Sequence, residues 1–239
     1  MLSYADVLAG GAEVGETVAV VGSGGIGFDV AEFLTHTHDD ASPSVNIDSF
    51  LQQWGVDGKN ATRGGLLEKP EWASQRKVQL LQRKHTKHGA ALGKTTGWIH
   101  RAGLNNMNVE MIGGVKYEKV DEDGNLHVEI TTRVEKKKGE KGGKKGKKGE
   151  VEVTKEKRIL VNDNIVVCAG QESLLELETP LAAAGVSCFR IGGAQYAGEL
   201  DANRAIDQAT RLALKVGRER ERGREGRERE ERGRGETDG

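Results

Sequence analysis

The stretch VAVVGSGGIGFDVAEFL, residues 18–34, decides the fold. It begins with an unbroken apolar run from Val18 to Val21, the pattern of a strand buried on both faces of a parallel sheet. Glycines follow at once, and apolar residues at helical spacing continue from Ile26 to Leu34. The stretch therefore predicts a strand, a tight turn and a helix in direct succession.

Gly22, Gly24 and Gly27 have the spacing G-x-G-x-x-G between this strand and this helix, which is typical of dinucleotide-binding units. The first glycine allows the tight turn, and the second lets a pyrophosphate approach the backbone. The third glycine lets the helix pack closely on the strand. The free N–H groups of the helix N-terminus would face the phosphates. The pattern favours dinucleotide binding over its alternative, a tight strand–helix turn with nothing bound.

The next strand is predicted at KVQLLQRK, residues 77–84, and its end bears on the choice between NADH and NADPH. Units that bind NADH place Asp or Glu there to hold the ribose 2′-hydroxyl. Here the strand ends in Gln82, Arg83 and Lys84, and an arginine can hold a 2′-phosphate through two hydrogen bonds. Arg83 and Lys84 therefore favour NADPH, the alternative being a solvated strand end.

The remaining chain alternates predicted strands and helices, so the expected fold class is α/β with a mostly parallel sheet. A polar excursion at residues 35–75 separates the first helix from the second strand and contains one amphipathic piece, NIDSFLQQWG. TTGWIHRAGLNNMN indicates a helix with Thr95 or Thr96 as its N-cap. Further strands are indicated by VEMIGGVKYEKV and LHVEITTRV, joined by the turn DEDGN, by EVEVTKEKRILVNDNIVVCAG, and by CFRI before a Gly-Gly turn and a closing helix.

Two charged segments stand apart from this pattern, although the totals of 36 Lys+Arg and 37 Asp+Glu nearly cancel. Residues 135–150 are rich in Lys and Gly, and residues 217–239 alternate Arg and Glu with interspersed Gly. Neither segment has apolar residues to bury, so both are predicted to be disordered. The Lys-rich segment has the charge to touch nucleic acid or an acidic membrane but no interleaved aromatic residues, so we expect neither partner.

The 2 cysteines, Cys168 and Cys188, have no C-x-x-C spacing, so we expect no iron–sulfur cluster and no zinc site. Both lie among apolar residues and are predicted to be buried structural thiols. His38 and its neighbours in HTHDD have no second cluster that would complete a metal site. No apolar run approaches the roughly 20 residues of a membrane span, and no signal peptide is visible. We therefore expect a cytoplasmic or organellar-matrix location.

Six segments stand out along the chain: LSYADVLAG, VAVVGSGGIGFDVAEFL, QLLQRK, LGKTTGWIHR, NIVVCAGQES and IGGAQYAGELDANRAIDQATRLAL. In this order, they resemble the C-terminal region of the bacterial-type NADPH-dependent 2,4-dienoyl-CoA reductases. These flavoproteins are related to trimethylamine dehydrogenase and the old yellow enzymes. The resemblance runs from residue 2 to about residue 216, apart from the Lys/Gly-rich segment, and GKTTGWIHR is its most specific part.

The resemblance implies an NADPH-binding domain at residues 1–164 and the returning C-terminal segment of an FAD domain at residues 165–216, followed by the charged tail. The matching positions assign one group of residues to the NADPH turn, one to the 2′-phosphate and one to the FAD segment. Near Glu199, a helix N-terminus would point at the flavin. The three groups are Gly22, Gly24, Gly25 and Gly27; Arg83 and Lys84; and Gly170, Gly193 and Glu199.

Enzymes of this family also carry an FMN-binding TIM barrel and a four-cysteine iron–sulfur cluster. Their first FAD-binding glycine turn lies upstream of the region that matches this chain. The resemblance thus implies a Rossmann-like FAD/NAD(P)-binding fold that is incomplete at its N-terminus, with FAD bound only when the missing region is supplied. We expect the NADPH-binding part of a flavoprotein that passes hydride from NADPH to flavin, served by a partner chain with the other cofactors. The alternative is a non-catalytic or truncated NADP-binding module that acts only with a partner. No catalytic acid or base is assigned.

Overall fold

A computed structural model describes residues 1–36, 42–135, 151–198 and 202–235 of the chain. The chain divides into a first unit, Met1–Ala169, and a second unit, Gly170–Gly239. The sequence placed the boundary between its two nucleotide-binding segments after residue 164. The strand at Asn164–Val167 pairs with two strands of the first unit.

The centre of the first unit is a parallel sheet of five strands in the order β1-β8-β2-β3-β4. β2 pairs with β3 on one side and with β8 on the other, and Val18, Ala19 and Val20 are fully buried. The apolar run therefore forms the central strand, as its lack of alternation predicted. The strands are β1 (Leu2–Ser3), β2 (Thr17–Val21), β3 (Lys77–Leu81), β4 (Glu110–Ile112) and β8 (Asn164–Val167).

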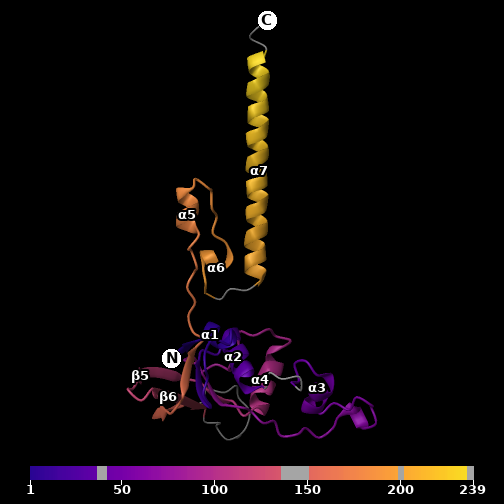
Figure 1. Cartoon of the computed structure of the whole chain (residues 1–239), viewed down its shortest axis with the longest axis vertical. Coiled ribbons are helices and arrows are strands. Elements are labelled where there is room, and N and C mark those ends of the chain that lie inside the picture. The colour runs from indigo at the N-terminus through magenta and orange to yellow at the C-terminus, as the bar shows by residue number, and fades with distance from the viewer. Residues whose placement is uncertain (37–41, 136–150, 199–201, 236–239) are drawn as a thin grey trace, which may run out of the picture. The chain divides into compact units, whose positions relative to one another are not determined.

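Helices cover one face of this sheet. They are α1 (Tyr4–Leu8), α2 (Gly25–Thr35) and α4 (Gly97–Asn106), and α2 contacts both of the others (Figure 1). Their shared core with β2 and β3 includes Val20, Phe28, Leu80 and Leu104. Thr96 stands at the N-cap position of α4, as predicted, but its side chain makes no capping hydrogen bond.

A second, antiparallel sheet packs against the other face of the parallel sheet. Its strands are β5 (Val115–Val120), β6 (Leu126–Glu135) and β7 (Val151–Leu160), in the order β5-β6-β7. Val128 and Leu160 of this sheet share a core with Ala19 and Ile165. Val18 and Val20 belong to the helix-side core, so alternate side chains of β2 pack on opposite faces of the parallel sheet.

The predicted strand VEMIGGVKYEKV is two strands in the structure, separated by Gly113 and Gly114. β4 joins the parallel sheet beside β3, whereas β5 enters the antiparallel sheet. The predicted turn DEDGN is confirmed, because Asp121 accepts a hydrogen bond of 2.8 Å from the backbone N–H of Asn125. The Lys/Gly-rich segment that follows β6 lies, apart from Glu135, outside the described residues.

The long excursion between α2 and β3 contains α3 (Ile47–Trp54) and the short helix η1 (Arg63–Gly65). α3 is the predicted amphipathic piece, and Figure 1 places it beyond α4. The rings of Trp54 and Trp72 meet edge to face, with centroids 5.4 Å apart. The two ends of the excursion meet, because the N–H of Gln75 donates to the carbonyl of Thr35 at 3.4 Å.

The second unit consists of α5 (Glu178–Ala183), α6 (Gly192–Gln195) and α7 (Ala202–Gly235). The strand predicted at CFRI is wrong, since residues 187–191 form no strand. A strand needs a neighbour that completes its hydrogen-bond ladder. The described residues of the second unit include no such neighbour. Among the described helices, none is both long and apolar enough to cross a membrane.

Helix α7 continues through most of the Arg/Glu tail. The prediction of disorder is therefore wrong for residues 217–235, while residues 236–239 lie outside the described ranges. Arg and Glu have high helix propensity, and in this sequence opposite charges recur at spacings of three and four residues. These local contributions stabilise a helix even where no apolar surface is buried.

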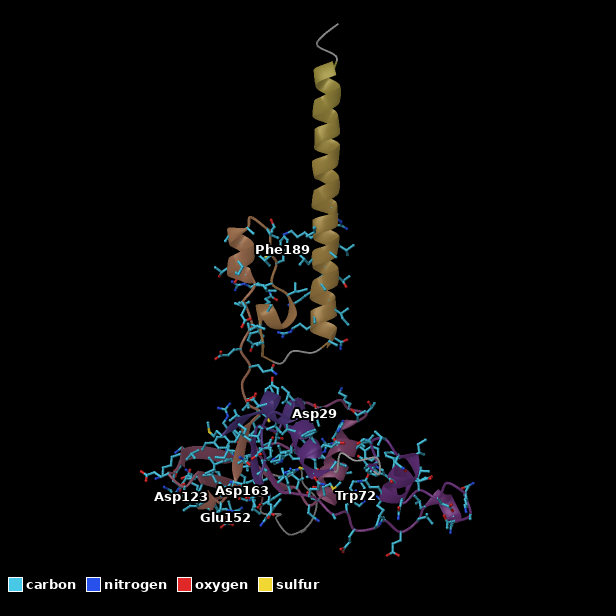
Figure 2. The ribbon with its side chains drawn as sticks, in the orientation of Figure 1. Asp29, Trp72, Asp123, Glu152, Asp163 and Phe189 are labelled. Carbon is cyan, nitrogen blue, oxygen red and sulfur yellow. The ribbon has the colours of Figure 1, made fainter. Side chains whose placement is uncertain are left out.

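Asp163 joins the start of β2 to the start of β8 and provides a pH-dependent contribution to stability (Figure 2 labels Asp163). Its Oδ2 atom accepts hydrogen bonds from the backbone N–H and the hydroxyl of Thr17, each 2.8 Å long. These bonds hold the pKa of the carboxyl below its ordinary value of 3.8. A lowered pKa stabilises the fold above the unfolded-state pKa, and this contribution disappears as the pH falls through the folded-state value.

We expect the stability of the protein to fall as the pH is lowered below 3.8, and to fall less steeply in the variant Asp163→Asn. Urea unfolding at a series of pH values, followed by tryptophan fluorescence, measures both slopes. Asp123→Asn, at an exposed turn residue, is the control and should keep the wild-type slope. An unchanged slope in Asp163→Asn would contradict the role of the Thr17 hydrogen bonds.

Candidate functional site

The predicted glycine turn follows β2 directly, at the C-terminal edge of the parallel sheet. Gly22 has φ +114°, a backbone conformation that residues with a side chain rarely adopt. A Cβ atom on Gly22 would also lie 2.8 Å from the carbonyl oxygen of Cys168, just beyond β8. Glycine is therefore required here both by its own dihedral angle and by the approach of the neighbouring backbone.

The other glycines of the turn divide into a packing position and two open positions. A Cβ atom on Gly27 would overlap the carbonyl oxygen of Gly22, so this glycine lets α2 begin against the turn. A Cβ atom on Gly24 or Gly25 would meet no heavy atom within 4 Å. The space over these two residues is therefore free for a ligand that approaches the backbone.

The N-terminus of α2 provides donors that face this open space. Gly24 is its N-cap and has no side chain, so no side-chain oxygen accepts from the first N–H groups of the helix. The hydroxyl of Ser23 is buried from water and has no hydrogen-bond partner within the described part of the chain. A phosphate group beside the turn would supply acceptors to both sets of donors, so these residues fit a dinucleotide.

Arg83 and Lys84 lie at the same edge of the sheet, just after the neighbouring strand β3, which ends at Leu81 and not at residue 84 as predicted. β2 and β3 pair in register, with Val21 opposite Leu81, and the N–H of Gly22 donates to the carbonyl of Leu81 at 3.0 Å. Arg83 and Lys84 follow two and three residues later, and both are exposed. The structure thus brings the glycine turn and the two predicted cations to adjacent strand ends.

Comparison with known proteins agrees with this architecture. No protein-family model matches the chain. The structure is similar to 2-naphthoyl-CoA reductase, solved as a complex with 2-naphthoyl-CoA, with a TM-score of 0.50 and 16% identity over 85% of this chain and 21% of that chain. The chain shares the mixed α/β fold of that protein, with helices packed on a five-stranded parallel sheet. It spans about a fifth of the length of that reductase.

A second solved structure in the comparison is a flavoprotein disulfide reductase from Escherichia coli, determined as a Cu(II) complex. Its TM-score is 0.41, with 11% identity over 85% of this chain and 36% of that chain.

Within this fold, the turn between β4 and β5 holds the backbone segment that carries Arg83 and Lys84. The N–H of Val115 donates to the carbonyl of Gln82 at 3.0 Å, and the N–H of Gly114 donates to the carbonyl of Lys84 at 3.1 Å. Gly114 has φ +70°, and a Cβ atom there would lie 2.5 Å from the imidazole of His85. Arg83 therefore extends from a fixed segment of backbone. Gly113 and Gly114 are the sequence signal for this turn. The prediction placed both of them inside a single strand and so missed the turn.

Tyr117 of β5 also lies at this edge of the sheet, and the sequence did not predict its position there. Its ring packs against the core that contains Leu81 and Ile112, the last residues of β3 and β4. Burial raises the pKa of its hydroxyl to about 12, and the positive charge of Arg83 acts in the opposite direction. The hydroxyl is therefore protonated at neutral pH and close enough to Arg83 to sense its charge. A single tyrosine in a predicted strand carries no signal of such a neighbour.

The residues predicted to face a flavin belong to the second unit. Gly170 is its first residue and has φ +83°. Gly193 lies in α6, where its carbonyl accepts a hydrogen bond of 2.7 Å from the hydroxyl of Ser173. Glu199 lies outside the described residues.

The two cysteines differ in their surroundings. Cys168 packs against the helix-side core, and burial raises the pKa of its thiol to about 12. Cys188 is exposed, so the prediction of a buried thiol is wrong there, because its apolar neighbours Val186 and Phe189 are themselves exposed. Within the described ranges, no group of three or more His, Cys, Asp or Glu residues could hold a metal ion. His38 in HTHDD lies outside those ranges.

A cavity of about 290 Å³ lies between the C-terminal end of α2, α3 and the segment before β3. Thr35, Gln52, Trp72 and Met107 are among its lining residues. Because the glycine turn precedes α2 and the cavity adjoins its other end, this cavity is separate from the candidate dinucleotide site.

Proposed function

We propose that the first unit binds NADPH, and that the chain is the NADPH-binding part of a flavoprotein oxidoreductase of the 2,4-dienoyl-CoA reductase type. The observation that carries this proposal is the open space over Gly24 and Gly25 beside the end of β3, which Arg83 and Lys84 follow after two and three residues. The likeness to the fold of 2-naphthoyl-CoA reductase supports an oxidoreductase context.

Different residues at this edge of the sheet bind different parts of NADPH. The N–H groups at the start of α2 and the positive end of the helix dipole bind the pyrophosphate, together with the hydroxyl of Ser23. Arg83 holds the 2′-phosphate through two hydrogen bonds, and Lys84 adds a second positive charge. Bound NADPH supplies a hydride for a flavin, and the chain positions the nicotinamide.

The second unit is proposed to contact the flavin that accepts the hydride. We assign this unit as the C-terminal segment of an FAD domain, in which Gly170, Gly193 and Glu199 face the FAD. A further segment or a partner chain supplies the first FAD-binding glycine turn, an FMN barrel and an iron–sulfur cluster. This arrangement rests on the family resemblance of the segment IGGAQYAGELDANRAI.

The cofactor preference tests the proposal. The wild-type protein should bind NADPH more tightly than NADH, and Arg83→Ala should weaken NADPH binding by roughly tenfold or more. A hydrogen bond to a charged group contributes about 1.5–3 kcal/mol, and each 1.4 kcal/mol corresponds to a tenfold change. Binding of NADH, which has no 2′-phosphate, should be unchanged. Isothermal titration calorimetry measures all four dissociation constants.

Arg63→Ala is the matched control, because Arg63 is also an exposed arginine but lies in the excursion. It should leave both affinities at the wild-type value. Equal wild-type affinities for NADPH and NADH would contradict the proposal, as would an Arg83→Ala variant that binds NADPH normally.

A further inference from the structure

Tyr117 lies near the proposed 2′-phosphate site, because the start of β5 lies beside the end of β3. The backbone of β5 begins beside the end of β3, since Val115 donates its N–H to the carbonyl of Gln82 at 3.0 Å. Two residues later, the ring of Tyr117 packs against the core that contains Leu81. Arg83 is likewise two residues beyond Leu81, so both side chains come from the same corner of the first unit.

Within the described ranges, the hydroxyl of Tyr117 is a donor without an acceptor. In the described part of the chain no hydrogen bond involves this hydroxyl, and it is not among the polar atoms sealed from water. The ring is partly buried while the hydroxyl stays within reach of a ligand. A tyrosine hydroxyl that serves only the core would be paired with a protein acceptor.

The charge beside this hydroxyl is positive. The positive charge of Arg83 lowers the pKa of the Tyr117 hydroxyl, against the larger effect of burial. A neutral donor beside a cation suits an anionic ligand with several acceptor oxygens, since each oxygen can accept from a different donor. The 2′-phosphate assigned to Arg83 and Lys84 is such a group.

We propose that the hydroxyl of Tyr117 donates a hydrogen bond to the 2′-phosphate of NADPH, as a third member of the site formed by Arg83 and Lys84. This role deepens the function proposed above and rests on it. Tyr117 thereby contributes to the discrimination between NADPH and NADH, because a hydrogen bond to a phosphate oxyanion is stronger than one to a ribose hydroxyl.

The variant Tyr117→Phe isolates the hydroxyl, because it keeps the ring that packs against the core. It should raise the dissociation constant of NADPH about tenfold, the effect of losing one hydrogen bond to a charged group. Binding of NADH should change by less than a factor of about two, on the same reasoning. Adenosine 2′,5′-bisphosphate and 5′-AMP differ only in the 2′-phosphate. In separate titrations, Tyr117→Phe should weaken binding of the bisphosphate and leave binding of 5′-AMP nearly unchanged. Calorimetry gives the affinities, and urea unfolding should show wild-type stability.

Tyr196→Phe provides the control, because Tyr196 belongs to the second unit and should leave every affinity unchanged. If the wild-type protein prefers NADPH, Arg83→Ala removes the preference, and Tyr117→Phe leaves it intact, the role of Tyr117 is overturned and the proposed function stands. Equal weakening of bisphosphate and AMP by Tyr117→Phe would also overturn it. Absence of any NADPH preference in the wild type would remove the proposed function itself.

Discussion

Replacing Gly27 with alanine should abolish NADPH binding and destabilise the first unit by about 3 kcal/mol or more, the upper range for overpacking a close contact. The new Cβ atom would overlap the carbonyl oxygen of Gly22, which is backbone and cannot rotate away. Helix α2 would have to move off the turn and disturb its packing on β3, where the same Cβ atom would lie 3.5 Å from Leu80. Urea unfolding and calorimetric titration measure the two losses.

Gly24→Ala is the matched control for this prediction. Its Cβ atom meets no heavy atom within 4 Å, so the variant should retain the wild-type free energy of unfolding. It should nevertheless weaken NADPH binding, because the methyl group occupies the path of the pyrophosphate to the backbone. A Gly27→Ala variant as stable as Gly24→Ala would refute the packing role of Gly27.

The second large effect is expected from Phe28→Ala. Phe28 is 1% exposed, belongs to the helix-side core and lies against Gly89, where an added Cβ atom would come within 2.9 Å of its ring. Truncation of a buried phenylalanine costs about 3–5 kcal/mol, from lost transfer free energy and the cavity left behind. The free energy of unfolding from urea titration provides the measurement.

Phe50→Ala is the corresponding control in α3, where Phe50 is 48% exposed. Its loss of stability should be well under half of that in Phe28→Ala, because less apolar surface returns to water. Similar losses in the two variants would mean that α2 does not anchor the core of the first unit.

The glycine turn and its helix could be predicted because their signals are local. The spacing of Gly22, Gly24 and Gly27, the apolar run before them and the helical pattern after them all lie within one short segment. Arg83 and Lys84 were equally accessible, since the end of a predicted strand is where a 2′-phosphate is bound in such folds. The parallel pairing of β2 and β3 confirms that these two segments share an edge.

Features that depend on contacts between distant segments could not be predicted. The alternation in VEMIGGVKYEKV is the same for both of its strands, so it could not reveal that β4 and β5 belong to different sheets. The proximity of Tyr117 to Arg83 follows from that division. The helical tail was missed for a different reason, because absent burial was treated as absent structure.

The closed base of the excursion has a consequence for how this fold tolerates change. Its ends are joined by the hydrogen bond between Gln75 and Thr35, and the side chain of Arg76 adds one to the carbonyl of Leu34 at 3.3 Å. When the ends of a loop are fixed, extra residues in the loop do not move the elements around it. The entropic cost of closing the loop also rises only slowly with its length. We therefore expect that residues can be added or removed in this loop, at one end of α2, while the candidate dinucleotide site at the other end keeps its geometry. A tolerant loop and the proposed ligand site thus lie at opposite ends of a single helix.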